Sequence, residues 1–214
     1  MRIGFCGAHR SGKTTLAKIV AEEYGLNFVD SPASKIVKDF EFDMARDNRL
    51  DFHNGSLGDS NNTGVSMQWA IYLSLINAID NNTWGGKSFV SDRTPLDVAA
   101  YMLADATAYA GEEWSQGEAM RMVQRAILDT ERMFDMVLLV PPGIQFMVED
   151  GKPPLNEAYQ EHHHMLCRGM LFDEDLDLFW DEIRRTTHTI EDRMDFVHGM
   201  ITEFGLDTTV KVAA

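Results

Sequence analysis

Residues 7–15 of the chain are GAHRSGKTT, and they directly follow the short apolar run RIGFC. The stretch fills the pattern G-x-x-x-x-G-K-[ST], with fixed positions at Gly7, Gly12, Lys13 and Thr14. Glycines there let successive backbone N–H groups turn inward and form a concave nest for phosphate oxygens. The lysine and the hydroxyl that end such a loop serve the outer phosphates and a magnesium ion. The pattern predicts a phosphate-binding P-loop.

The residues on either side of the loop supply the context that a chance match would lack. Residues 2–6 are short and apolar enough for a buried strand. After the loop, Leu16, Val20 and Tyr24 fall on one helical stripe that ends at Gly25. The helix beginning near Lys13 adds the positive end of its dipole to the nest. We therefore expect a nucleoside triphosphate to bind here.

The predicted ligand is ATP with Mg²⁺. We expect Lys13 to be exposed to the β- and γ-phosphates and the hydroxyl of Thr14 to be a metal ligand. The predicted nucleotide contacts are Gly7, His9, Arg10, Ser11, Gly12, Lys13, Thr14 and Thr15.

Length and composition predict a single domain over residues 1–214. The net charge of −15, from 19 basic and 34 acidic residues, disfavours a broad surface for duplex DNA. It does not exclude a local basic cleft. No apolar run approaches the roughly 18 residues that span a membrane, and the N-terminus does not resemble a signal peptide. We expect a cytoplasmic protein without membrane contact. The two cysteines indicate no disulfide framework.

Strand patterns alternate with helix patterns along the chain. Strands are expected at 2–6, 26–30, 87–91, 135–140 and, more weakly, at 186–190. Helices are expected after Pro32, at 65–81, twice within 95–134, at 156–184 and at 191–203. This order predicts the α/β class and a P-loop NTPase fold, with a parallel five-stranded sheet between helices. Residues 43–64 are predicted to be a flexible excursion, and residues 145–170 a small helical lid.

Charged residues follow two of these strands, at the sheet edge where ligands bind in such folds. Asp92 is placed to serve the metal, and Asp30 to face the phosphate acceptor; a helix cap is the alternative for Asp30. Arg93 could hold an acceptor phosphate bidentately. Asp97 is assigned to the substrate site, with a plain helix N-terminal acid as an equally weighted alternative.

GAHRSGKTTLAK, the aspartate after the second strand, DRTPLDVAAY and PPLNEAYQEHHHMLCRGML together resemble a phage-type, thymidylate-kinase-like branch of the P-loop nucleoside and nucleotide kinases. The resemblance covers roughly residues 1–172. It implies that Asp92 and Arg93 form the family's Asp-Arg pair. It also places Gln68 where related kinases read a base edge, with an ordinary exposed glutamine as the alternative. Related members include deoxynucleoside monophosphate kinases and kinases of 5-hydroxymethyluracil in phage DNA.

The chain departs from that family in its lid, which is usually rich in arginine. The candidate lid offers only Lys152 and Arg168, both predicted to bind substrate. Arg10, Arg125 and Arg132 are the other cations considered for neutralising phosphate charge.

The leading hypothesis is a Mg²⁺-dependent kinase that moves the γ-phosphate of ATP to a nucleotide-type acceptor. The acceptor is a deoxynucleoside monophosphate or a hydroxyl, including the hydroxymethyl group of a 5-hydroxymethylpyrimidine in phage DNA. A DNA-borne base would have to be single-stranded or flipped, and the protein would act in the host cytoplasm. The sequence does not decide whether the protein forms a homodimer. The alternative is a P-loop ATPase or switch that couples hydrolysis to assembly; the guanine-reading N-K-x-D of GTPases is missing after the fourth strand. A non-enzymatic nucleotide sensor is the third alternative.

Overall fold

The computed structural model describes residues 1–39, 63–83, 86–108, 113–143 and 156–205. Within these ranges it contains strands and helices that alternate along the chain. Their bounds are β1 Arg2–Cys6, α1 Lys13–Tyr24, β2 Asn27–Val29, α2 Ala33–Asp39, α4 Thr63–Thr83, β3 Phe89–Ser91, α5 Pro95–Ala108, α6 Glu113–Met133, β4 Met136–Leu139, α7 Glu157–Leu171, β5 Phe179–Glu182 and α8 Ile190–Glu203.

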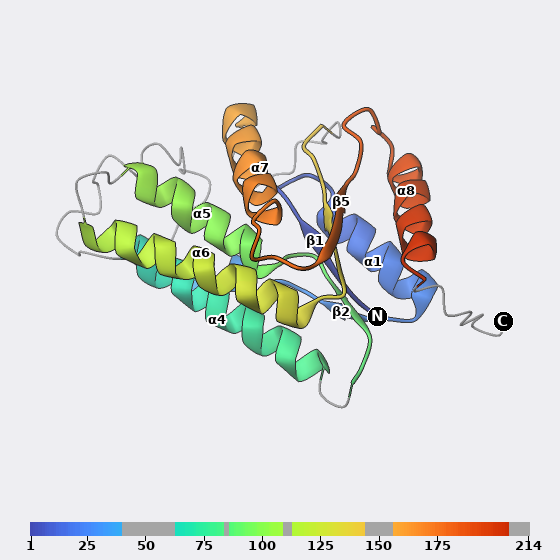
Figure 1. Ribbon diagram of the computed structural model, residues 1–214, viewed down its shortest axis with the longest axis horizontal. Helices are drawn as coiled ribbons and strands as arrows, with labels where there is room; N and C mark the ends of the chain where they lie inside the picture. The colour runs from blue at the N-terminus through green and yellow to red at the C-terminus, as the bar shows by residue number, and fades with distance from the viewer. Residues whose placement is uncertain (40–62, 84–85, 109–112, 144–155, 206–214) are drawn as a thin grey trace.

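The five strands form one parallel sheet in the order β2-β3-β1-β4-β5. Because every crossover between parallel strands must pass over a face of the sheet, helices cover both faces. In Figure 1, α4, α5, α6 and α7 lie on one side of the sheet, and α1 and α8 lie on the other. The predicted α/β fold with a parallel five-stranded sheet is confirmed.

The side chains of each strand alternate between the two faces and build two separate cores. In β4, Met136 and Leu138 pack against α1 and α8, whereas Val137 and Leu139 pack against α4 to α7. Such a strand, buried on both faces, shows a continuous apolar run in the sequence. The sheet is therefore a rigid platform, and its carboxyl edge carries the P-loop.

The fifth strand lies earlier in the chain than expected. A weak strand is expected at residues 186–190, but Thr187 closes a turn on Arg184 and Thr189 caps α8. The strand is instead Phe179–Glu182, paired with β4. The expected helix 156–184 ends at Leu171, and Asp173 accepts a bond from the N–H of Asp175 in the turn that follows. Short polar side chains that bond to nearby backbone favour turns and caps over strands.

Most of the predicted excursion (43–64) and all of the first part of the predicted lid (145–155) lie outside the described residues. The second part of the predicted lid is α7, which packs on α5 and has buried His163 and His164 on its inner side. Among the residues that the structure describes, no helix is both long enough and apolar enough to cross a membrane.

Candidate active site

The P-loop joins β1 to α1 and takes its shape from three residues with positive φ. These angles are 136° at Gly7, 58° at Arg10 and 91° at Gly12. A Cβ on Gly7 would lie 2.3 Å from the carbonyl oxygen of Val140, so the position requires glycine for space as well as for conformation. Gly12 is also the N-cap of α1, whose first backbone bond runs from the N–H of Leu16 to the carbonyl of Gly12. The loop therefore has the nest geometry that the motif predicts.

Lys13 points into the loop. Its ammonium donates hydrogen bonds to the carbonyl oxygens of Gly7, at 2.5 Å, and Ala8, at 2.7 Å. The residue is only 6% exposed, which differs from the exposed lysine that we expected. Two carbonyl oxygens thus hold the cation at the phosphate nest, where a phosphate oxygen would be a stronger partner.

Thr14 and Asp92, the two predicted metal ligands, meet directly. The Thr14 hydroxyl donates a 2.8 Å hydrogen bond to one carboxylate oxygen of Asp92, and the other oxygen accepts from the Ser31 N–H at 3.1 Å. Asp92 is 7% exposed. A hydroxyl and a carboxylate at the end of a phosphate-binding loop are hard oxygen donors, so the pair fits Mg²⁺, which binds through few protein ligands plus substrate phosphates.

Asp97 is fully buried beneath the P-loop and anchors it. One carboxylate oxygen accepts from the Gly7 N–H at 3.0 Å; the other accepts from the N–H and hydroxyl of Thr94, at 2.8 and 2.9 Å. Thr94 immediately precedes α5, and the Asp97 carboxylate reaches back to the Thr94 N–H, which is one half of a capping box. The Lys13 ammonium lies 3.8 Å away. Asp97 has no exposed surface. Its assignment to the substrate site stays a prediction, beside the alternative of a helix N-terminal acid.

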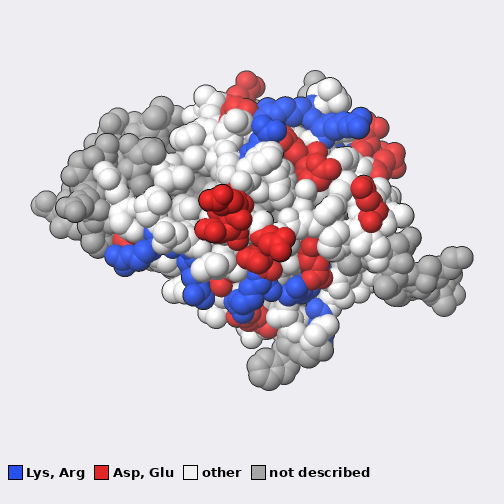
Figure 2. Space-filling view, in the orientation of Figure 1, with Lys and Arg blue, Asp and Glu red and all other residues white. Residues whose placement is uncertain are grey.

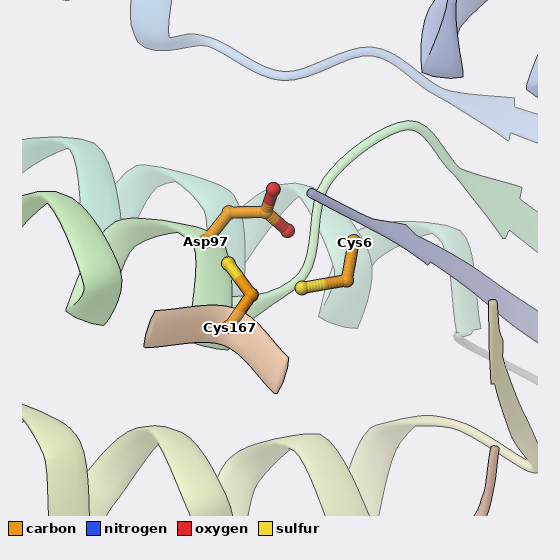
Figure 3. Close-up of side chains that lie close together, drawn as sticks. All are labelled: Cys6, Asp97 and Cys167. Carbon is orange, nitrogen blue, oxygen red and sulfur yellow. The ribbon is translucent and has the colours of Figure 1, made fainter. Parts of the chain in front are cut away.

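Figure 3 shows Cys6 from β1, Asp97 from α5 and Cys167 from α7 converging in the core. All are fully buried, and burial raises the pKa of the Cys6 thiol well above its usual value. A metal ion would need both thiolates and a carboxylate that already accepts bonds from Gly7 and Thr94, next to the Lys13 ammonium. The set fits neutral thiols that fill space beneath the loop.

The second half of the Asp-Arg pair lies against aromatic rings. The Arg93 guanidinium carbon is 5.4 Å from the ring centre of Tyr101, and that ring is 4.0 Å from His163 of α7. Helix α7 also reaches the P-loop, because the side-chain amide of Gln160 donates a 2.6 Å bond to the carbonyl of His9. The start of the predicted lid helix is thus tied to the nucleotide loop.

Asp30 and Gln68 face different surroundings. Asp30 follows β2, is exposed, and makes no side-chain bond among the described residues; Ser31, not Asp30, caps α2 through a 3.3 Å bond from the Ala33 N–H. Gln68 is 3% exposed, so the ordinary exposed glutamine is ruled out. Its assignment to base reading stays a prediction.

Most of the cations considered for the phosphates have partners elsewhere. Arg168 pairs with Glu182 at 2.9 Å, and Arg125 and Arg132 both pair with Asp129 on α6. Lys152 lies outside the described residues. Arg10, in the loop itself, is half-buried.

Sequence reasoning missed two residues that contact the loop, Gln160 and Arg193. Each binds a P-loop carbonyl, of His9 and of Ser11 respectively. Both come from helices far along the chain, and no local pattern signals such a contact.

No protein-family model and no curated protein matches the sequence. Among solved structures, the deoxyadenosine kinase from M. mycoides with bound dCTP is similar at a TM-score of 0.64 and 11% identity, over 95% of this chain and 100% of that one. The NadR protein in complex with NR is similar at a TM-score of 0.67 and 14% identity, over 100% of this chain and 52% of that one. Thymidylate kinase from Candida albicans is similar at a TM-score of 0.60 and 14% identity, over 94% of this chain and 91% of that one. The chain therefore has the fold of the P-loop nucleoside and nucleotide kinases.

Proposed function

We propose that the protein is a Mg²⁺-dependent kinase that transfers the γ-phosphate of ATP to a hydroxyl of a nucleoside-type acceptor. The observation that supports this proposal most directly is the pairing of β2 with β3. Val29 and Ser91 are in register, so the acids that follow them, Asp30 and Asp92, lie at adjacent strand ends beside the P-loop. Asp92 contacts Thr14, whereas Asp30 is exposed and has no partner among the described residues.

The donor half of the site is built from the loop and from Asp92. The backbone N–H groups of the nest and the ammonium of Lys13 would hold the β- and γ-phosphates. Thr14 and Asp92 would hold Mg²⁺, which neutralises phosphate charge when it is bound. Asp97 would keep Gly7 in place through its 3.0 Å bond, so that the nest is formed before nucleotide arrives.

The acceptor half depends on Asp30. A hydroxyl must lose its proton as it attacks, and an exposed carboxylate at the neighbouring strand end can take it. The acceptor oxygen then bonds to the γ-phosphorus, the bond from the γ-phosphorus to the β–γ bridging oxygen breaks, and ADP leaves. Arg93, stacked on Tyr101, would orient the acceptor or the moving phosphoryl group.

The distribution of cations favours a hydroxyl over a monophosphate. A monophosphate acceptor brings about two negative charges next to those of ATP, and it needs cations rather than a base. Arg168, Arg125 and Arg132 are all paired with carboxylates. A nucleoside is therefore a better match than a monophosphate. The acidic side chains that Figure 2 shows over the connection between α7 and β5 play no part in this argument, because that connection enters β5 at the amino edge of the parallel sheet, opposite the P-loop.

The decisive experiment incubates the protein with γ-labelled ATP and Mg²⁺. The acceptor panel contains deoxynucleosides, ribonucleosides, deoxynucleoside monophosphates and single-stranded DNA carrying 5-hydroxymethyluracil. The same panel is run with Asp30→Asn and with the control Glu22→Gln, which removes an exposed acid on α1.

We expect the wild type and the control variant to transfer label to a nucleoside. The kcat of Asp30→Asn should be lower by a hundredfold or more, which is on the order of a general-base effect. Label on a monophosphate with unchanged kcat in Asp30→Asn would replace the hydroxyl acceptor by a phosphate. Label on the DNA that is absent when thymine replaces 5-hydroxymethyluracil in the same strand would identify the hydroxymethyl group. ATP hydrolysis without transfer to any acceptor would contradict the kinase and leave the ATPase switch.

A further inference from the structure

Arg193 is the largest of the fully buried side chains among the described residues. It comes from the first turns of α8, on the face of the sheet opposite α4 to α7. Arginine is almost never fully buried unless it is paired, so its surroundings require an explanation.

The guanidinium of Arg193 binds three backbone carbonyls from three separate segments. Nη1 donates to Ser11 of the P-loop at 2.7 Å, Nη2 to Pro141 after β4 at 3.3 Å, and Nε to Thr187 before α8 at 3.1 Å. These are the segments that surround the nucleotide loop at the carboxyl edge of the sheet. One side chain thus fixes their relative positions.

Among the described residues, the partners of Arg193 are backbone carbonyls and none is an acid. Across the described ranges of the chain, no carboxylate forms an ion pair with it, and burial lowers the pKa of its guanidinium without an opposing acidic partner. A buried charge without a counter-charge is unfavourable even when its N–H groups are satisfied. In the described part of the structure, the guanidinium of Arg193 is therefore a buried positive charge without a counter-charge, and it bonds to the carbonyl of Ser11, the residue before Gly12.

We propose that Arg193 is a positioning residue for the phosphate nest and that the phosphate chain of the bound nucleotide is its counter-charge. The proposal rests on the proposed function, because it requires that the P-loop binds a nucleoside triphosphate. It names a residue on α8 that contacts no phosphate and acts through the loop and through its charge.

The geometry of the Ser11–Gly12 peptide explains the positioning. In a planar trans peptide the C=O and the following N–H point in opposite directions. Because Arg193 holds the Ser11 carbonyl at 2.7 Å in the core, the Gly12 N–H is turned to the other side of the loop. Gly12 has φ of 91°, a conformation in which this orientation is available without strain. The guanidinium therefore aims one donor of the nest.

The test measures binding of Mg·ATP, inorganic tripolyphosphate and adenosine to the full chain by calorimetry. The variants are Arg193→Met, which removes the charge and the donors, and Arg193→Lys, which keeps the charge but cannot reach three carbonyls. Arg121→Met is the control, because Arg121 is 68% exposed and pairs with Glu118 on the surface of α6. Melting temperatures are recorded with and without tripolyphosphate.

We expect Arg193→Met to weaken ATP and tripolyphosphate alike, with adenosine unchanged. A unit charge about 8 Å from a phosphate, at an effective dielectric constant of about 20, corresponds to a roughly thirtyfold change in affinity. Arg193→Lys should lose less, and its KM for ATP should rise while its KM for the acceptor stays constant. If Arg193→Met does not fold, Arg193→Lys carries the test.

A purely structural role predicts a different result. The variants would then melt earlier but bind tripolyphosphate within twofold of the wild type, which would overturn the proposal and leave the kinase intact. If the wild type itself binds neither ATP nor tripolyphosphate, the proposed function fails together with the role of Arg193.

Discussion

Replacing Asp97 by asparagine tests whether this residue anchors the P-loop. Asparagine has nearly the same shape as aspartate, so the substitution leaves no cavity and changes only charge and hydrogen bonding. The carboxylate accepts three bonds, from the Gly7 N–H, the Thr94 N–H and the Thr94 hydroxyl, and it is fully buried.

An amide retains one acceptor oxygen and replaces the other with an NH₂ donor. Whichever way the amide is oriented, this donor faces either the Gly7 N–H or the Thr94 N–H, and a buried N–H loses its acceptor. Losing a hydrogen bond to a charged group inside the protein costs about 1.5–3 kcal/mol. We therefore expect the free energy of unfolding to fall by about 2–3 kcal/mol, which lowers the melting temperature by roughly 5–10 °C in a chain of this size.

The assay is urea and thermal unfolding of Asp97→Asn beside the wild type, with the affinity for tripolyphosphate measured on the same samples. Asp80→Asn is the control, since Asp80 is 51% exposed and lies 3.8 Å from Arg132. That surface pair is expected to contribute less than about 1 kcal/mol. Tripolyphosphate should bind more weakly to Asp97→Asn, because Gly7 is no longer held.

An unfolding free energy within about 0.5 kcal/mol of the wild type would refute the anchoring argument, since ordinary surface substitutions reach that size. A stable variant whose acceptor KM alone rises would instead assign Asp97 to the substrate site.

Three other substitutions follow from the site and its surroundings. Lys13→Ala should lower turnover on the order of a hundredfold or more while the fold is retained, as measured by kcat and circular dichroism; near-normal activity would contradict the P-loop assignment. Asp92→Asn should weaken the dependence on Mg²⁺ and lower kcat with every acceptor, which a magnesium titration checks. Burial lowers the pKa of His164 below its ordinary value of 6.5, and Glu182 opposes part of that shift. As the pH falls, the unfolded chain therefore binds the proton before the native protein does. The contribution of neutral His164 to the free energy of unfolding is fully present above pH 6.5 and is lost as the pH drops through the lowered native pKa. His164→Gln should flatten this dependence in urea unfolding between pH 7.5 and 5.5, whereas the exposed His162→Gln should not.

The amino-acid sequence by itself determined the P-loop and the acids at the strand ends. Both are local features, since the spacing from Gly7 to Thr14 lies within one turn and the start of a helix. Asp30 and Asp92 each come one residue after an apolar strand. The rule that ligands bind at the carboxyl ends of parallel strands then places them on one edge, as the register of Val29 with Ser91 shows.

The sequence misplaced the fifth strand for an equally physical reason. The threonines of 186–190 have strand propensity, but their hydroxyls also serve as turn and cap groups, and Thr189 caps α8. Pairing with β4 selected Phe179–Glu182 instead, and pairing is a property of the assembled sheet.

Only the tertiary structure decided which distant side chains hold the loop. Asp97 reaches Gly7 across 90 residues of sequence, Gln160 reaches His9 across 151, and Arg193 reaches Ser11 across 182. A local pattern carries no information about such contacts, because they depend on how α5, α7 and α8 pack against the sheet. Asp97 and Arg193 have ordinary helical neighbours in the sequence, and only burial with the backbone of the P-loop as partner gives them their roles.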